Sequence, residues 1–184
     1  MGKTRSLGII VAAVVLITGC ATRPSYNTRG IPAFYLNPPV SKDAIYGVGD
    51  AKMSSLSMSR TTALTRARDD VARQIEVLVK NAITDYAQEA GQGTNQQAVE
   101  FTEIVSRQLV DITLRGLVTK EVVVARDGRV FAMVEYPTDS LMAAANQTFV
   151  RNEAAAFAEF KAEVAVQKLN QELTANPSQA GGDR

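Results

Sequence analysis

The chain has 184 residues, of which 46% are hydrophobic and 21% charged, with a formal net charge of +1. This balance is ordinary for one globular domain with a modest core, and it lacks the basic excess that favours nucleic acid as a partner. With no histidine and a single cysteine, the chain cannot form a Ser-His-Asp or Cys-His site and lacks the commonest metal ligand. Nucleophilic catalysis by serine with lysine, by threonine or by a carboxylate stays open, but no such group of residues converges in the sequence. We therefore expect no cofactor, no nucleic acid ligand and no enzymatic activity.

The first twenty residues have the pattern of a lipoprotein signal. Lys3 and Arg5 precede an apolar run over residues 7–17, which is short for a membrane span, and small residues lead to the only cysteine. Residues 17–20 resemble a bacterial lipobox, which predicts cleavage between Gly19 and Cys20 and lipidation of Cys20. Several acyl chains on one residue anchor stably, because each buried methylene contributes roughly 0.8 kcal/mol. The alternatives are an ordinary secretory signal and a single N-terminal transmembrane helix.

Residues 20–43 contain four prolines and no sustained period, which predicts an extended tether between the lipid and a domain. The apolar residues 31 and 34–36 indicate that part of this tether docks on the domain or on a neighbouring subunit. Residues 44–51 then alternate like a strand, and Gly47 and Gly49 within it indicate a bulge or a closely packed helix. A phosphate-binding loop is the weaker alternative, because the third glycine of the Gly-x-Gly-x-x-Gly spacing is missing.

Two amphipathic helices follow. Residues 54–89 carry an apolar stripe at helical spacing, with Ser54 or Ser55 as the predicted N-cap and glycines at 91 and 93 ending the helix. Its polar face predicts three ion pairs four residues apart, namely Arg66–Asp70, Asp69–Arg73 and Glu76–Lys80. A solvated face is the ordinary interpretation, and a site for anionic glycan or lipid at Arg66, Arg68 and Arg73 is the minority one. A second helix is expected from about residue 99 to residue 115.

The second half of the chain predicts a hairpin and a long helix. Residues 117–125 and 130–136 form the hairpin around the turn Asp127-Gly128. A final helix over residues 138–174 is expected to pack its first half on the domain and to project its second half, and residues 175–184 are expected to be disordered. The predicted class is α+β, with a small antiparallel sheet (one strand plus a β-hairpin) packed by a long helix and a second helix. The predicted units are 1–19 as signal, 20–43 as tether, 44–137 as domain, and 138–174 as C-terminal helix.

The order of these features resembles a known family. The chain resembles the LPP-twenty family of small bacterial outer-membrane lipoproteins. The resemblance rests on the lipobox, the proline-rich tether, the strand residues 46–49, the small residues Ala63, Ala67 and Ala72 of the long helix, and the hairpin residues 127–131. The resemblance covers roughly residues 44–136, and the family includes a flagellar outer-membrane protein. It implies an α+β domain with no catalytic residues to carry over.

Two functions are compatible with this pattern. The first is a lipid-anchored outer-membrane lipoprotein whose periplasmic, non-catalytic domain forms homo-oligomers, as a structural component associated with the flagellar motor. The second is a tethered periplasmic module that binds and regulates an envelope enzyme such as a peptidoglycan synthase. Ala21 favours the outer membrane, because an aspartate at this position retains lipoproteins in the inner membrane of well-studied enteric bacteria. The expected partners are the membrane, through the lipid on Cys20, further copies of the chain, and flagellar or envelope proteins.

Overall fold

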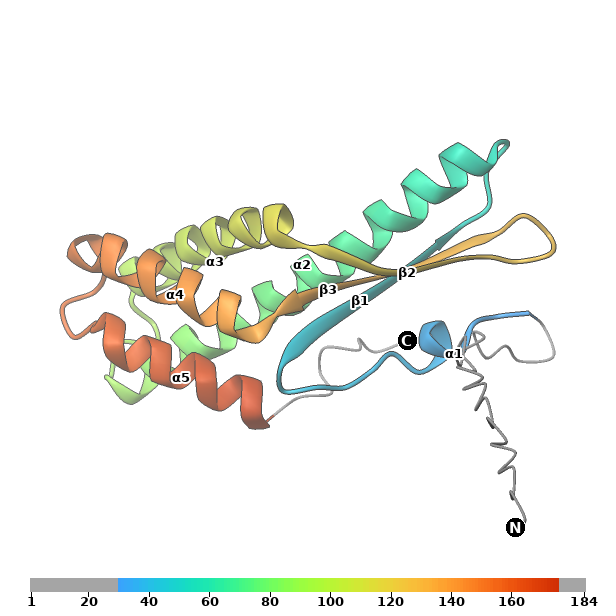
Figure 1. Ribbon diagram of the computed structural model, residues 1–184. Coiled ribbons are helices and arrows are strands. Elements are labelled where there is room, and N and C mark those ends of the chain that lie inside the picture. Colours follow the sequence, from blue (N-terminus) through green and yellow to red (C-terminus); the bar gives the residue numbers. More distant parts are fainter. Residues whose placement is uncertain (1–29, 176–184) are drawn as a thin grey trace, which may run out of the picture.

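The computed structural model describes residues 30–175 (Figure 1). In chain order the elements are α1 (Ala33–Leu36), β1 (Ala44–Ala51), α2 (Leu56–Glu89), α3 (Gln96–Gly116), β2 (Val118–Val124), β3 (Val130–Pro137), α4 (Thr138–Asn152), the 3-10 turn η1 (Glu153–Ala155) and α5 (Ala162–Ala175). The first half of α2 lies along the sheet, and α3, α4 and α5 gather around its second half. The predicted α+β class is confirmed. Within residues 30–175, no helix is long and apolar enough to cross a membrane.

The sheet has three antiparallel strands in the order β1-β3-β2. The predicted hairpin is confirmed, with Val123 opposite Phe131 and the Ala125 amide donating to the Arg129 carbonyl at 2.8 Å. Gly128 has a φ of 83°, which explains the glycine in this turn. A register shift between Thr119 and Glu121 interrupts β2, so the more regular pairing is that of β3 with β1.

The two glycines of β1 allow α2 to lie directly on the strand. A Cβ built on Gly47 would lie 2.3 Å from the carbonyl oxygen of Ala67, and one built on Gly49 would lie 2.4 Å from that of Ala63. Ala63 and Ala67 are themselves fully buried. The closely packed helix expected from these glycines is therefore confirmed. A phosphate-binding loop at this place is wrong, because the backbone of α2 occupies the space over the strand.

The same helix also caps the free edge of β1. Three side chains, each one turn further along α2, bond to backbone groups of the strand: Arg66 donates to the Asp50 carbonyl (2.6 Å), Asp70 accepts from the Val48 amide (3.0 Å) and Gln74 donates to the Tyr46 carbonyl (2.9 Å). An uncapped edge would offer these groups to a strand of another chain. α2 thus covers one face of β1 and closes its edge.

This capping changes the ion pairs that helical spacing predicts. Glu76–Lys80 is confirmed at 3.0 Å. Arg66 and Asp70 instead turn toward β1, and Arg73 pairs with Asp70 at 2.8 Å. The predicted pairs Arg66–Asp70 and Asp69–Arg73 are therefore wrong, because the four-residue spacing of helical ion pairs takes no account of contacts with a neighbouring strand.

The segment after β3 forms two helices, so the expectation of one continuous helix with a projecting second half is wrong. α4 ends at Asn152, and α5 returns along α2 and α4 with Leu169 fully buried. The break coincides with a cluster of rings from α2, α3, α4 and the turn, whose centroids lie 4.5–6.4 Å apart: Tyr86, Phe101, Phe149, Phe157 and Phe160. Tyr86 fixes the turn further, because its hydroxyl donates to the Glu159 carbonyl at 2.7 Å and accepts from the Lys161 amide at 2.9 Å. Burial of these rings outweighs the helix propensity of the alanine-rich turn.

The end of the predicted tether docks on the sheet, as its apolar residues indicated. Tyr35 of α1 packs edge-on against Phe131 with ring centroids 4.9 Å apart. α1 lies on the face of β1 and β3 opposite to α2. The folded unit therefore begins before residue 44.

Candidate functional site

The most connected polar group is the carboxylate of Asp50, near the end of β1. Its Oδ1 accepts from the Tyr35 hydroxyl at 2.6 Å, and its Oδ2 forms an ion pair with Arg129 of the hairpin. The Asp50 backbone carbonyl accepts from Arg66, so α1, α2 and the hairpin all meet at this residue. We call Tyr35, Asp50, Arg66 and Arg129 the Asp50 cluster. It borders a cavity of about 300 Å³ that Phe131 and Asp127 also line.

The Asp50 cluster keeps its carboxylate ionised. Burial raises the pKa of Asp50, but the hydrogen bonds from Tyr35 and Arg129 and the positive charges of Arg129 and Arg66 outweigh it and hold the pKa below its usual value. The pKa of Arg129 is raised by the same pair. A carboxylate with a donor on each oxygen and a lowered pKa is poorly suited to transfer protons at neutral pH. The arrangement therefore joins elements of the fold and is poorly placed for chemistry.

A second pair stabilises the tip of the hairpin. Asp127 accepts from the Arg129 amide at 3.1 Å and from the Lys52 ammonium at 3.3 Å, which together lower the pKa of Asp127. Both charged side chains are about half exposed, so this ion pair contributes little to stability. It links the segment before α2 to the hairpin turn.

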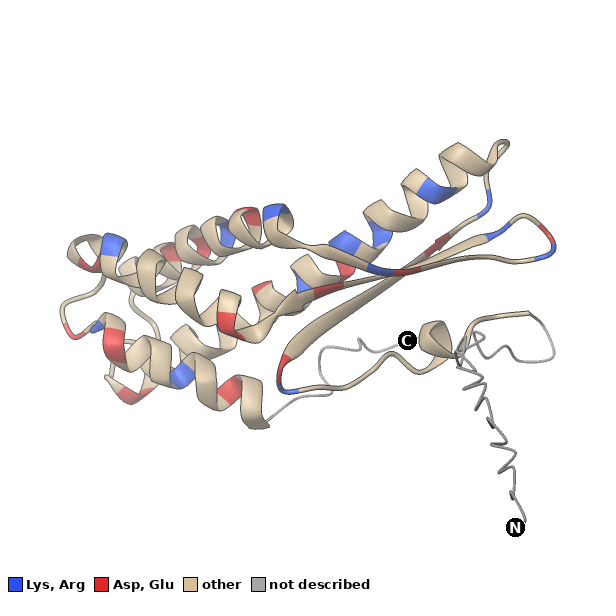
Figure 2. Cartoon of the chain, viewed as in Figure 1, with Lys and Arg blue, Asp and Glu red and all other residues tan. Residues whose placement is uncertain are grey.

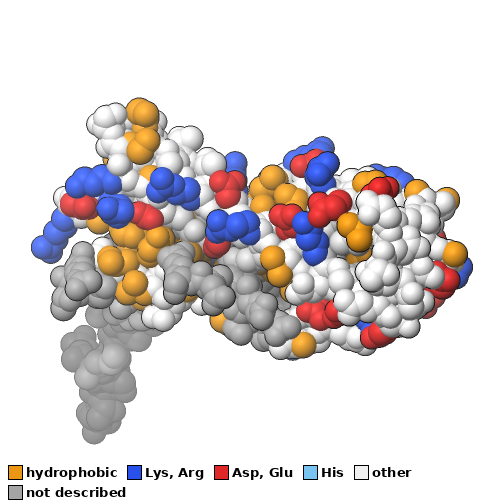
Figure 3. Space-filling model, turned by 180° about the vertical axis from the view of Figure 1, so that it is seen from behind, with side chains coloured by type: hydrophobic (Ala, Val, Ile, Leu, Met, Phe, Trp, Pro, Cys, Tyr) orange, Lys and Arg blue, Asp and Glu red, His pale blue; other side chains and the backbone are white. Residues whose placement is uncertain are grey.

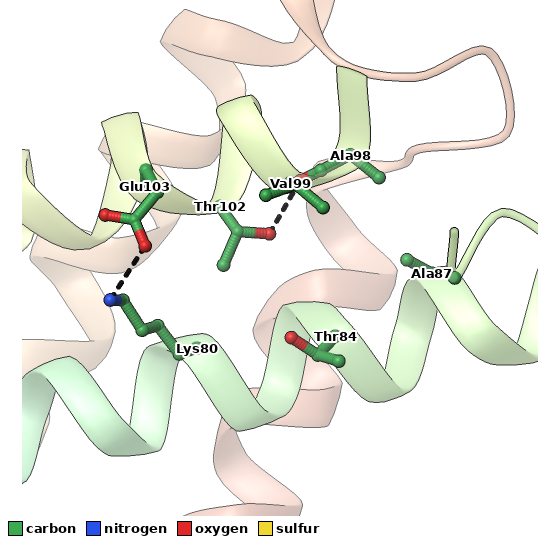
Figure 4. A pocket seen from close by; sticks show the side chains of 8 residues that line it. Lys80, Thr84, Ala87, Ala98, Val99, Thr102 and Glu103 are labelled. Atoms are coloured by element: carbon green, nitrogen blue, oxygen red, sulfur yellow. Dashed lines mark hydrogen bonds and ion pairs between the residues drawn. The ribbon is translucent and has the colours of Figure 1, made fainter. Parts of the chain in front are cut away.

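A small pocket of about 140 Å³ lies between α2 and α3 (Figure 4). The Lys80 ammonium reaches across from α2 to Glu103 of α3 at 2.8 Å, and it also contacts Glu76 at 3.0 Å. These hydrogen bonds raise the pKa of Lys80, so the amine stays protonated and is no nucleophile. The Thr102 hydroxyl donates to the Ala98 carbonyl at 2.7 Å, which uses its proton. The pocket is thus a gap between α2 and α3 that an ion pair bridges.

The residues predicted as sites are dispersed or lie outside the described range. Gly19 and Cys20, together with the signal 1–19 and the tail from residue 176, belong to the parts that the structure does not describe, so cleavage and lipidation stay predictions. Arg66 and Arg73 hold Asp50 and Asp70, so the three arginines do not form a single anion site. No group of three potential metal-ligating side chains occurs between residues 30 and 175. The Asp50 cluster was missed, although an acid at the end of a strand and an arginine after the predicted turn were signals for it.

The predicted lipoprotein signal and the small α+β domain are together typical of a bacterial lipoprotein. The chain belongs to the LPP20 lipoprotein family, whose sequence profile matches residues 32–136. The match begins at the N-cap of α1 and ends within β3, so α4 and α5 follow the matched region. No curated protein matches the chain significantly. The family makes the protein a lipoprotein of the cell envelope.

Proposed function

We propose that this lipoprotein is anchored in the outer membrane through Cys20 and that its periplasmic domain assembles with further copies of the chain. In this proposal the assembly is a non-catalytic structural component of the envelope, associated with the flagellar motor. The observation that carries this proposal is the contrast between satisfied polar groups and exposed apolar ones. The carboxylates and amines of the Asp50 cluster and the α2–α3 pocket are held in internal pairs. Large apolar side chains are instead half exposed on several elements, among them three at the start of α2 and Val150 near the end of α4, where another protein surface could cover them.

The docked α1 supports a position close to the membrane. Because Tyr35 is bound to the sheet, only residues 21–34 separate Cys20 from this docked residue. Even fully extended, these fourteen residues reach only about 50 Å at roughly 3.3–3.6 Å each. This short reach fits assembly beneath the outer membrane better than regulation of an enzyme far across the periplasm.

Cross-linking in the native host tests the proposal. The chain is cross-linked in intact cells and purified, and the products are identified by mass. Recovery of chain multimers together with flagellar components is the expected result. Recovery of monomers with one peptidoglycan synthase would reject assembly in favour of the tethered regulator.

Intact mass and surface labelling test the anchor and the compartment. Mass analysis of the purified protein is expected to show acyl chains on a chain that begins at Cys20, and unmodified Cys20 would contradict the anchor. A membrane-impermeant lysine reagent applied to whole cells is expected to leave the domain unlabelled, since a periplasmic domain is shielded by the outer membrane.

A further inference from the structure

The start of α2 is an exposed apolar tip at one end of the molecule. Met53, Leu56 and Met58 are 44%, 57% and 50% exposed, and they lie on or next to the first turn of the helix. Figure 1 shows this turn at the far end of the molecule from α4 and α5, and Figure 3 shows apolar side chains on the protruding end. Within residues 30–175 about half of each side chain stays uncovered, although each loses free energy of transfer by staying in water.

The tip also carries positive charge. Arg60 lies on the next turn and Arg126 lies in the adjacent hairpin turn, whereas Lys52, which precedes the helix, is paired with Asp127 of that turn. The first turn of α2 contains no acidic residue, so the positive end of the helix dipole is not offset there. Figure 2 shows basic residues following α2 and the hairpin at this end. We call Met53, Leu56, Met58 and Arg60 the α2 tip.

The opposite end of the molecule has a groove of complementary character. α4 and α5 line an open surface groove of about 640 Å³. Its apolar lining comes from both helices: Met142, Val150, Val164 and Val166. Two acids, Glu153 and Glu163, and one cation, Lys161, complete it. We call this the α4–α5 groove, and it lies outside the segment that the family profile matches.

We propose that the α2 tip of one copy docks in the α4–α5 groove of the next copy. The apolar side chains of the tip fill an apolar groove, and Arg60 meets an edge where acids outnumber bases. The tip and the groove lie at opposite ends of the molecule, so the contact is head-to-tail and one copy can bind two neighbours. Such contacts build rings or filaments. This inference rests on the proposed self-assembly and specifies the two surfaces that carry it.

Two single substitutions test the contact between the α2 tip and the α4–α5 groove. The full chain is used, solubilised in detergent with micelles in large excess. Leu56→Asp places a negative charge on the tip, and it is compatible with folding because the helix dipole favours an acid in the first turn. Val150→Lys places a cation in the groove at a side chain that is 58% exposed. Ile104→Asp and Val77→Lys are the matched controls, since these side chains are 49% and 47% exposed and line neither surface.

Each test variant is expected to weaken self-association at least tenfold by light scattering, while the controls assemble like the unchanged chain. The decisive sample mixes the two test variants in equal amounts. The L56D copy keeps its groove and the V150K copy keeps its tip. The tip of the V150K copy is therefore expected to bind the groove of the L56D copy, and assembly is expected to stop at a one-to-one dimer. Circular dichroism of each variant must match that of the unchanged chain.

Three results would overturn the inference. Assembly that both variants leave intact would exclude these surfaces while preserving the proposed function. Loss of assembly in both variants without dimers in the mixture would exclude the head-to-tail pairing. Unchanged assembly, with L56D abolishing binding to phosphatidylglycerol vesicles, would assign the tip to an anionic membrane. A chain that stays monomeric at every concentration would instead refute the proposed function itself.

Discussion

Replacing Gly47 with alanine tests whether the contact between β1 and α2 organises the fold. The added Cβ would lie 2.3 Å from the Ala67 carbonyl oxygen and 2.6 Å from a methyl group of Val71. An ordinary contact needs at least about 3.4 Å, so α2 must move by about 1 Å. The nearest obstacle is the backbone of α2, so a change of the Val71 rotamer would not relieve the clash.

The expected cost follows from overpacking of a core, which typically destabilises by about 1–3 kcal/mol. We expect the upper end, because a shift of α2 also stretches the bonds that cap the edge of β1. A loss of about 3 kcal/mol lowers the Tm of a chain of this size by roughly 6–12 °C. The full chain in detergent is heated and followed by circular dichroism at 222 nm.

Gly91→Ala is the matched control. Gly91 has a φ of 72° and open space around its Cβ position, so alanine costs only the strain of a left-handed backbone, about 1–2 kcal/mol. Gly47→Ala must therefore lower the Tm clearly more than Gly91→Ala does. Equal shifts, or a smaller shift for Gly47→Ala, would refute the argument from close approach.

Three further predictions concern the polar cluster, the capped edge and the aromatic cluster. The pKa of Asp50 is lowered in the folded state, so the stability that this carboxylate contributes is complete above its unfolded pKa near 3.8 and is lost as the pH falls through the folded value. Asp50→Asn should therefore reduce the fall of Tm at acidic pH. An unchanged fall of Tm in this variant would contradict the role of the Asp50 cluster. Asp70→Ala leaves the Val48 amide without its partner, so it should lower the free energy of unfolding in urea by about 1–3 kcal/mol. It should also promote pairing of β1 between chains, which a cross-β dye detects, with Asp69→Ala as the control. Phe160→Ala should cost about 3–5 kcal/mol, measured by the same unfolding, whereas a loss below 1 kcal/mol would show that the ring cluster does not hold the turn.

Features set by neighbouring residues could be predicted from the sequence. The hairpin follows from alternation on both sides of Asp127-Gly128, and Ser55 caps α2 as expected, accepting from the Met58 amide at 3.2 Å. Gly47 and Gly49 indicated a close helix because a missing side chain within a strand leaves room for one. These signals are local, so one sequence was enough to find them.

Features that depend on distant residues could not be predicted in the same way. The Asp50 cluster joins residues that are 15, 16 and 79 positions apart in the chain. The break after Asn152 was hidden because Phe149, Ala156 and Phe160 fit one helical stripe, whereas the pocket that receives the rings is built by α2 and α3. Helix propensity describes a chain in water, and it fails where a preformed apolar surface competes for the same side chains.

The position of Asp50 has a mechanical consequence for a protein held by its N-terminus. A pull from the membrane enters the fold at α1 and reaches Tyr35, whose hydroxyl is held by the Asp50 carboxylate. From there the load divides between the hairpin through Arg129 and the long helix through Arg66. We expect these contacts to share the tension among α1, the hairpin and α2, so Tyr35→Phe should lower the force at which the domain begins to yield.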